Sequence, residues 1–330
     1  MSSQIAPGTS SQIRKLDLTG FLTKQAPWIL LLLLILIPSI TNPDFRSLGN
    51  LQGFLESAAV LILLTLGESF VLFVAGIDLA VGAGLALGSV ILAMSLSSNY
   101  GLIVGLILCI GVVGLCGFLN GVIVAYLKIP SFIVTFGMMA AESAIALVLS
   151  GGNRIDLPAT TQIPNLVYDS FLSIPYETWI TIVLVIILGA LLYYFRPFRN
   201  LYAVGSNATA ARLSGISVKK TLILAFTLSG LLSGIGAVLY TARIVSGDPL
   251  AGTNLNLEAI AAAVIGGINL FGGRGNMVGA VLGAVIYSLI DNVLNLYGVN
   301  PNIAELVGGA ILIIAAFMNV VNLRRKGTRA

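Results

Sequence analysis

The sequence has no histidine, only two cysteines and few charged side chains among its 330 residues. Without histidine, the chain lacks a common zinc ligand and the usual base at neutral pH. Cys109 and Cys116 lie seven residues apart in one apolar stretch, where a helix rises about 10 Å, so a disulfide between them is excluded. An enzyme would need a nucleophile with a base, or a set of metal ligands. We therefore expect neither a metal site nor a catalytic site.

The scarcity of charge excludes an ordinary soluble domain. Charged residues make up 9% of the chain, against roughly a quarter in soluble proteins. Apolar residues make up 57%, and the mean hydropathy is +1.01. A chain this apolar cannot cover a globule with polar side chains, so its surroundings must be mostly lipid. The net charge of +4 comes from basic residues beside apolar stretches, which favours anionic lipid over nucleic acid as the partner.

A phosphate-binding loop is also missing. The segment 271–275 is rich in glycine and carries Arg274, but it lacks the Gly-Lys-Ser/Thr sequence of such a loop. No other segment supplies one. We expect that this chain binds no cofactor and does not hydrolyse ATP.

The fold class that follows is an all-α polytopic membrane protein. A bilayer needs about 20 apolar residues per helix. Ten segments are candidate spans: 26–41, 54–75, 79–98, 101–126, 131–150, 178–195, 221–245, 255–271, 276–297 and 303–322. The segments 79–98 and 255–271 are rich in glycine or interrupted, so half-helices or re-entrant segments are the alternative there.

The expected organisation is one transmembrane domain between two short tails. Residues 26–322 form this domain, and residues 1–25 and 323–330 are the tails. No small-residue cleavage site follows the first apolar run directly, so we expect it to stay as an anchor helix.

The basic residues predict the orientation. With the N-terminus in the cytoplasm and spans alternating, few basic residues fall outside, namely Arg46 and Arg154, with Arg243 near the outer end of its helix. The others lie inside: Arg14, Lys15, Lys24, Lys128, Arg196, Arg199, Arg212, Lys219, Lys220, Arg274, Arg324, Arg325, Lys326 and Arg329. Both termini are therefore expected in the cytoplasm.

A weak internal repeat suggests two related halves. The sequence Gly-Ile-Asp-Leu at 76–79 is echoed by Gly-Ile-Asn-Leu at 267–270. In each half a helix containing asparagine follows, with Asn120 or Asn292, and then a proline. Duplicated halves are common in transporters. The alternative is a chance similarity, because a sequence built from few types of apolar residue often repeats short patterns.

The segment 76–84 is a glycine-rich break between two spans. Gly76 and Gly82 permit turns and close approach that other residues resist. Asp78 can cap the helix that follows and satisfy amides that lipid cannot. The break is either a capped hairpin or a border of a transport path, and the two are compatible.

Acidic residues inside spans are costly, at about 2.5–3.5 kcal/mol each at mid-bilayer. Glu68 and Glu142 are deep in their spans, and we place them, with Asn120, on a candidate substrate path. Pairing with a neighbouring helix is the alternative. Glu56 and Glu305 are near helix ends, which explains them as interfacial residues.

The segment 129–137 offers a possible surface for a sugar. Phe132 and Phe136 lie four apart on one helical face with Thr135 beside them. Aromatic faces beside a hydroxyl suit sugar rings, which have apolar faces and polar edges. Phenylalanine facing lipid is the alternative.

The basic connection 196–220 contains a short helical pattern from Asn207 that Gly215 ends. Such a helix either lies on anionic lipid or docks on a cytosolic partner.

Taken together, these motifs resemble the membrane subunits of ABC importers of the ribose or monosaccharide type, a family shared with branched-chain amino-acid permeases. The resemblance covers residues 30–320 and is carried by segments 76–82, 129–137, 203–216, 257–267 and 272–275. It implies two permease subunits around a pore and an ATPase pair that binds ATP and Mg²⁺. It also implies a separate substrate-binding protein and a location in the inner membrane.

The same resemblance assigns residues 203–220 as the segment that couples the permease to its ATPase. The contact residues that it implies are Asn207, Thr209, Ala210, Ala211, Arg212 and Gly215. Ala80, Glu142 and Thr209 depart from the family pattern, which has Ser, Arg and Glu there, so the substrate is open. Nucleosides and branched-chain amino acids are alternatives to a sugar, and a proton-coupled transporter using Glu68 or Glu142 is a further one.

Overall fold

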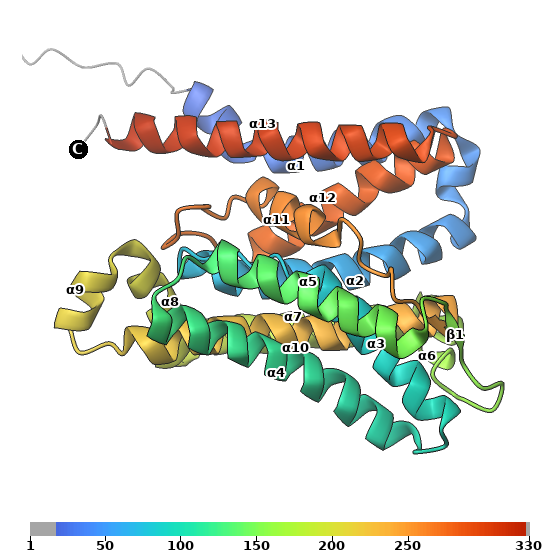
Figure 1. The fold of residues 1–330 in the computed structure, drawn as a ribbon. Helices are drawn as coiled ribbons and strands as arrows, with labels where there is room; N and C mark the ends of the chain where they lie inside the picture. Colours follow the sequence, from blue (N-terminus) through green and yellow to red (C-terminus); the bar gives the residue numbers. More distant parts are fainter. Residues whose placement is uncertain (1–17, 328–330) are drawn as a thin grey trace, which may run out of the picture.

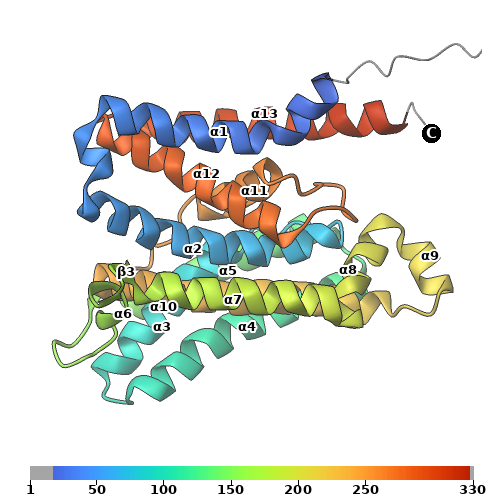
Figure 2. The same cartoon turned by 180° about the vertical axis from the view of Figure 1, so that it is seen from behind.

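The computed structural model describes residues 18–327, which form a bundle of helices (Figures 1 and 2). The α-helices are α1 (Leu18–Thr41), α2 (Leu48–Phe73), α3 (Val81–Ser97), α4 (Leu102–Leu127), α5 (Ser131–Ser150), α6 (Asn165–Tyr168), α7 (Tyr176–Tyr194), α8 (Arg196–Ser206), α9 (Ala208–Leu213), α10 (Val218–Ile244), α11 (Leu255–Ile265), α12 (Met277–Leu296) and α13 (Pro301–Gly327). A 3-10 helix, η1, covers Pro43–Arg46. The strands β1 (Ile155–Asp156) and β4 (Ser246–Gly247) pair antiparallel, as do β2 (Ser170–Phe171) and β3 (Ile174–Pro175).

Every one of the ten predicted spans coincides with a helix. Among the described residues, α2, α4, α5, α7, α10 and α12 are long and apolar enough to cross a membrane. The chain is therefore a helical, polytopic protein, and the count of ten spans stays a prediction. The first and last helices extend further than expected, because α1 begins at Leu18 and α13 ends at Gly327. The rest of the two predicted tails lies outside the described residues.

The two glycine-rich segments form short helices, α3 and α11, that begin inside the bundle. The eleven residues of α11 rise about 16 Å, roughly half of the hydrocarbon core. The side-chain amide of Asn256, in the first turn of α11, donates to the carbonyl of Leu79 just before α3 (3.3 Å). A Cβ on Gly82 would lie 2.3 Å from the carbonyl oxygen of Gly252, so the two helix starts meet backbone to backbone. The short α11 fits the half-helix alternative, whereas the 17 residues of α3 rise about 26 Å, most of the hydrocarbon core.

Helices α4 and α10 are packed through small residues. A Cβ added to Gly117 would lie 2.4 Å from the carbonyl oxygen of Phe226, and one on Gly230 would lie 2.6 Å from that of Val113. Helices in lipid gain little from the hydrophobic effect and associate through such close contacts. Residues of α4 and α10 line the small cavity beside the break between α2 and α3.

The α9 end of the bundle gathers the connections that the alternating topology places on one side. The amide of Gly273 donates to the carbonyl of Phe73 (3.1 Å). Gly205 packs so closely against the backbone of both residues that an added Cβ would overlap them. The ammonium of Lys219 lies 4.0 Å from the centre of the Tyr126 ring. The echoed segments 76–79 and 267–270 each follow a helix that ends near this end. Whether they mark duplicated halves stays a prediction.

The β1 end gathers the other connections (Figure 1). Asn50 and Asn292 exchange hydrogen bonds through their side chains, and β1 pairs with β4. Arg154 and Asp248 form an ion pair at 2.7 Å. Connections that are predicted to lie on the cytoplasmic side thus contact one another at the α9 end. Connections predicted to lie outside contact one another at the β1 end, as expected for helices that alternate in direction.

The outward faces of α4, α5 and α7 are apolar. Ile107, Val148 and Ile186 have 66%, 80% and 64% of their surface exposed. Large apolar side chains exposed on long helices fit a lipid environment or a neighbouring membrane subunit.

Gly117→Leu is expected to destabilise the bundle because the added side chain would overlap the backbone of α10. The matched control is Gly111→Leu, since Gly111 lies on the same helix with nothing within 4 Å of an added Cβ. Melting of the purified protein in detergent measures both changes. We expect a lower melting temperature for Gly117→Leu alone. Equal melting temperatures for the two variants would contradict the α4–α10 contact.

Candidate functional site

The break between α2 and α3 is an irregular stretch of backbone whose polar groups find partners inside the bundle. The amide of Ile77 donates to the hydroxyl of Ser131 (3.0 Å), and the hydroxyl of Thr135 donates to the carbonyl of Ile77 (3.1 Å). The amide of Asp78 donates to Oε1 of Glu68 (3.3 Å). Side chains of α2 and α5 thus supply the hydrogen bonds that a helix or strand would otherwise supply to this backbone. Backbone polar groups inside an apolar bundle need such partners.

Asp78 does not cap α3 in the way the sequence predicts. Ala80 is the N-cap residue, and it makes no side-chain capping bond. The Oδ1 atom of Asp78 instead accepts from the amide of Ala80 (3.0 Å), two residues along the chain. This contact stabilises the turn that leads into α3.

Three acidic side chains meet behind this break. Glu68, Asp78 and Glu142 are 0%, 2% and 2% exposed, and Asn120 of α4 is 1% exposed. Asp78, Asn120 and Glu142 face a small cavity of about 10 Å³, which has room for roughly one water molecule. The rest of its lining is Ala80, Val81, Gly84, Val113, Gly117, Gly230 and Ser233. The lining contains no lysine or arginine.

Several polar oxygens of the cluster, including the hydroxyl of Ser229, have no hydrogen-bond partner among the described residues. They also include Oε2 of Glu68, Oε2 of Glu142 and Oδ1 of Asn120. Buried polar atoms normally have partners, so these oxygens mark a place where hydroxyl or water hydrogens would be bound. No group of His, Cys, Asp and Glu in residues 18–327 could hold a metal ion.

The predicted path residues are partly brought together. Glu68, Asp78, Asn120 and Glu142 share the cluster, and Thr135 supports the break beside it. Gly76 packs against Val71 and Phe226, and Gly82 lies at the contact between the two half-helices.

The two predicted aromatic residues do not line this cavity, and their place on a substrate path stays a prediction. Phe132 and Phe136 are 53% and 58% exposed on the outer face of α5, away from the cavity. The periodicity indicated correctly that they share a face, but it could not indicate which way that face points.

Two serines of α10, which were not among the predicted site residues, belong to the same region. The hydroxyl of Ser233 donates to the carbonyl of Val81 (2.5 Å), and Ser229, fully buried, lies beside Asp78. Their spacing of four residues in an apolar helix places them on one face and was the signal available.

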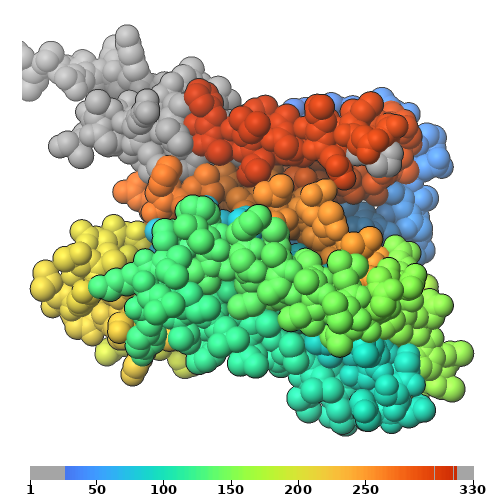
Figure 3. Space-filling view, viewed as in Figure 1, coloured from blue at the N-terminus to red at the C-terminus, as the bar shows by residue number. Residues whose placement is uncertain are grey.

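The predicted coupling segment forms a projection at the α9 end (Figures 1 and 3). Oδ1 of Asn207 accepts from the amide of Ala210 (2.9 Å) and caps α9. At the other end, the amide of Ile216 donates to the carbonyl of Ala211 (3.0 Å), and Gly215 has φ +81°. This geometry ends the helix as the sequence predicts, because glycine adopts positive φ without strain.

The side chains of α9 divide into an anchored and an exposed set. Ala211 is buried, whereas Thr209, Ala210 and Arg212 are exposed. Leu213 is 85% exposed, and the sequence analysis did not select it. A large apolar side chain at the tip of a projecting helix is typical of a surface that a partner covers.

Aromatic contacts join this projection to the break. The Tyr202 ring of α8 lies 4.5 Å from that of Phe73, the last residue of α2, and the Phe198 ring lies 6.1 Å from that of Phe70. Burial raises the pKa of Tyr202 to about 12, so its phenol is neutral at physiological pH. Because of these ring contacts, α8 packs directly against the last residues of α2, which lead into the break.

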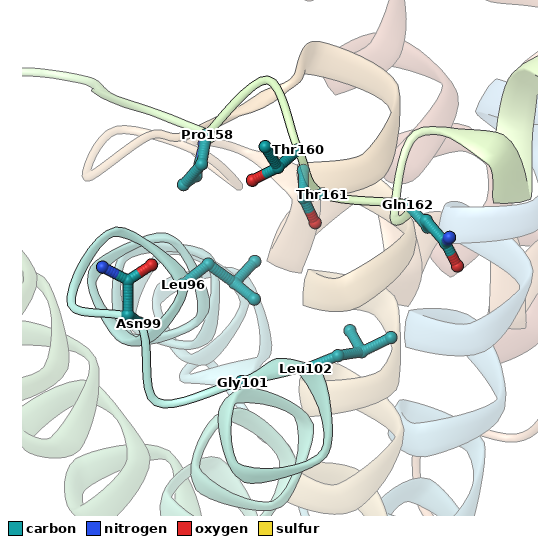
Figure 4. A pocket seen from close by; sticks show the side chains of 8 residues that line it. All are labelled: Leu96, Asn99, Gly101, Leu102, Pro158, Thr160, Thr161 and Gln162. Carbon is teal, nitrogen blue, oxygen red and sulfur yellow. The ribbon is translucent and has the colours of Figure 1, made fainter.

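A larger pocket opens at the β1 end (Figure 4). It has a volume of about 280 Å³ and lies between the α3–α4 turn and the segment after β1. Its lining is uncharged: Leu96, Asn99, Gly101, Leu102, Pro158, Thr160, Thr161 and Gln162.

The apolar helices, the buried break and the projecting α9 define a multi-pass membrane protein of the transporter class. The family model for branched-chain amino acid transport system permease components matches residues 50–316. The chain belongs to this family, whose members are transport components.

Curated relatives match nearly the whole chain. The ribose import permease RbsC of Haemophilus influenzae is 35% identical over 303 residues, which cover 90% of this chain and 93% of the relative. RbsC of Bacillus subtilis is 35% identical over 310 residues, covering 93% and 95%. The autoinducer 2 import permease LsrC of Escherichia coli O157:H7 is 35% identical over 303 residues, covering 89% and 88%. No solved structure matches the chain.

Glu68→Leu is expected to lower the stability of the break, since the buried amide of Asp78 loses its acceptor. An unsatisfied buried donor costs about 1–3 kcal/mol. Glu68→Gln keeps an acceptor oxygen at the same position and serves as the matched control. Thermal melting of the two purified variants tests this role, with a loss expected for leucine and little change for glutamine. A leucine variant as stable as the wild type would show that the contact does not hold the break.

Proposed function

We propose that this chain is the permease subunit of an ATP-driven ABC importer that moves a monosaccharide such as ribose across the inner membrane. The observation that carries this proposal is the similarity to ribose import permeases along about 90% of the chain. The uncharged pocket at the β1 end and the unpaired polar oxygens of the cluster suit a neutral molecule with several hydroxyl groups.

In this proposal the α9 end faces the cytoplasm and both termini lie there. The charge distribution supports this orientation, because Arg196, Arg199, Arg212 and Lys219 lie around α9. Acidic residues gather at the opposite end, including Asp44, Asp156, Asp169 and Asp248.

A separate ATPase pair, which would carry ATP and Mg²⁺, docks on α9 through exposed side chains that include Arg212 and Leu213. Closure of the ATPase pushes α9 and α8, and the contacts of Tyr202 and Phe198 pass this movement to the end of α2. The break then shifts, and the bundle changes between outward-open and inward-open states. Coupling requires that nucleotide or substrate prefers one of these states.

The acid cluster lies in a closed part of this path. A cavity of about 10 Å³ is too small for a sugar, so helices around the cluster must separate, or the sugar must pass beside it, during transport. Weak binding there suits import, because tight binding would slow release. Affinity belongs to a binding protein that delivers substrate at the β1 end, and a second permease copy completes the pore.

The proposal is tested with the permease, its ATPase and its binding protein reconstituted in liposomes with labelled ribose. We expect uptake that needs ATP and survives a proton uncoupler, with Arg212→Glu losing both ATPase co-purification and uptake. The charge reversal places an acid where the docking surface is basic.

The matched control for this experiment is Arg46→Glu, the same charge reversal at an exposed residue of the β1 end. It should co-purify with the ATPase as the wild type does. Uptake that collapses with the uncoupler but not with ATP depletion would overturn the importer proposal in favour of proton coupling. Normal ATPase binding by Arg212→Glu would remove α9 as the docking site.

A further inference from the structure

A second polar pocket lies in the β1-end half of the bundle, where α2, α10, α11 and α12 meet. It has a volume of about 200 Å³ and is lined by Ser57, Val60, Leu61, Tyr240, Arg243, Leu255, Glu258, Tyr287, Ser288 and Asp291. At roughly 10–15 Å³ per water, the measure used for the smaller cavity, it has room for roughly 13–20 water molecules. It accommodates a molecule of monosaccharide size, unlike the cavity beside the acid cluster.

The pocket has an apolar floor and a polar mouth. Val60 and Leu61 are 3% and 4% exposed at its base, and Ser288 is 6% exposed. Ser57 and Asp291 are exposed at its opening. Small-molecule sites combine an apolar wall with a few convergent polar groups in this way.

The polar groups of the pocket are positioned by neighbouring contacts. Nη1 of Arg243 donates to the hydroxyl of Ser57 (3.0 Å), and its guanidinium carbon lies 5.7 Å from the centre of the Tyr240 ring. Oδ2 of Asp291 accepts from the side-chain amide of Asn295 (3.2 Å). Glu258 occupies the first turn of α11, the half-helix that begins inside the bundle.

The carboxylates of the pocket keep capacity for a ligand. Neither Glu258 nor Asp291 forms an ion pair with a described residue. Two carboxylates face one guanidinium, and two phenols and two hydroxyls beside them can each donate or accept a hydrogen bond. A ligand that donates several hydrogen bonds and is uncharged fits this lining better than an anion does.

The aromatic residues add a second requirement. Tyr240 and Tyr287 each present a ring with a polar tip, which suits a ligand with an apolar face and polar edges. A polyhydroxylated ring has both features, and its adjacent hydroxyls can bridge a carboxylate.

We propose that the pocket bounded by Arg243, Glu258 and Asp291 is a binding site for a small polyhydroxylated molecule, separate from the acid cluster. The site lies toward the β1 end and binds its ligand before the ligand reaches the closed part of the bundle. The order in which the ligand meets this site and the closed part of the bundle rests on the proposed function, as does the choice of ribose as the probe.

The test measures binding of labelled D-ribose to the purified full-length permease in nanodiscs, without ATPase or binding protein. We expect saturable, weak binding that Asp291→Asn and Glu258→Gln each weaken on the order of tenfold, as loss of a charged hydrogen-bond acceptor implies. Asp44→Asn is the matched control, because Asp44 is an exposed acid at the same end that does not line the pocket.

A second measurement remains informative if a variant folds poorly. A cysteine in place of Ser57, at the mouth, should react with a maleimide more slowly when D-ribose is present. Absence of both ribose binding and this protection would overturn the proposal. So would ribose binding that is unchanged in Asp291→Asn and Glu258→Gln.

A competing ligand class is examined in the same assay with L-leucine, a zwitterion. Binding of leucine but not ribose, with loss in Asp291→Asn, would overturn the polyol assignment. Because no ATPase is present, a failure here leaves the Arg212→Glu result on motor docking unaffected. A failure of motor docking likewise leaves the binding result unaffected.

Discussion

The structure depends on one constraint, which is that irregular backbone inside an apolar bundle must find hydrogen-bond partners. The break between α2 and α3 meets it with the side chains of Glu68, Ser131 and Thr135. Each partner belongs to a helix next to the break, so the break can move only if those helices move with it. An acidic residue inside a membrane bundle thus has a structural task as well as a possible role on the path.

Close backbone contacts connect the α9 end of the molecule to the break. Gly205 at the end of α8 and Gly273 are pressed against the carbonyl of Phe73, only a few residues before the break. The α9 projection is therefore joined to the centre of the bundle by direct packing. Contacts of α8 with the end of α2 link α9 to the break beside the acid cluster, and this is the route that the proposed coupling would use.

Much of the fold could be predicted from hydropathy, because ten apolar segments gave ten helices at nearly the expected places. Glycine and Asn207 also located α9 correctly. The direction of the Phe132 face could not be predicted, since an apolar helix in lipid has no polar side to orient it. The pocket at Arg243 was missed because its residues come from four helices and carry no local motif.

The central claim is that the two ends of the bundle face opposite sides of the membrane, with α9 on the cytoplasmic side. Single cysteines at Thr209 and Thr160, both exposed and at opposite ends, report this directly in a chain without Cys109 and Cys116. With an impermeant maleimide, the Thr160→Cys variant should react on intact cells, and Thr209→Cys only after the membrane is opened. Labelling of both positions from the same side, or the reverse pattern, would contradict the account.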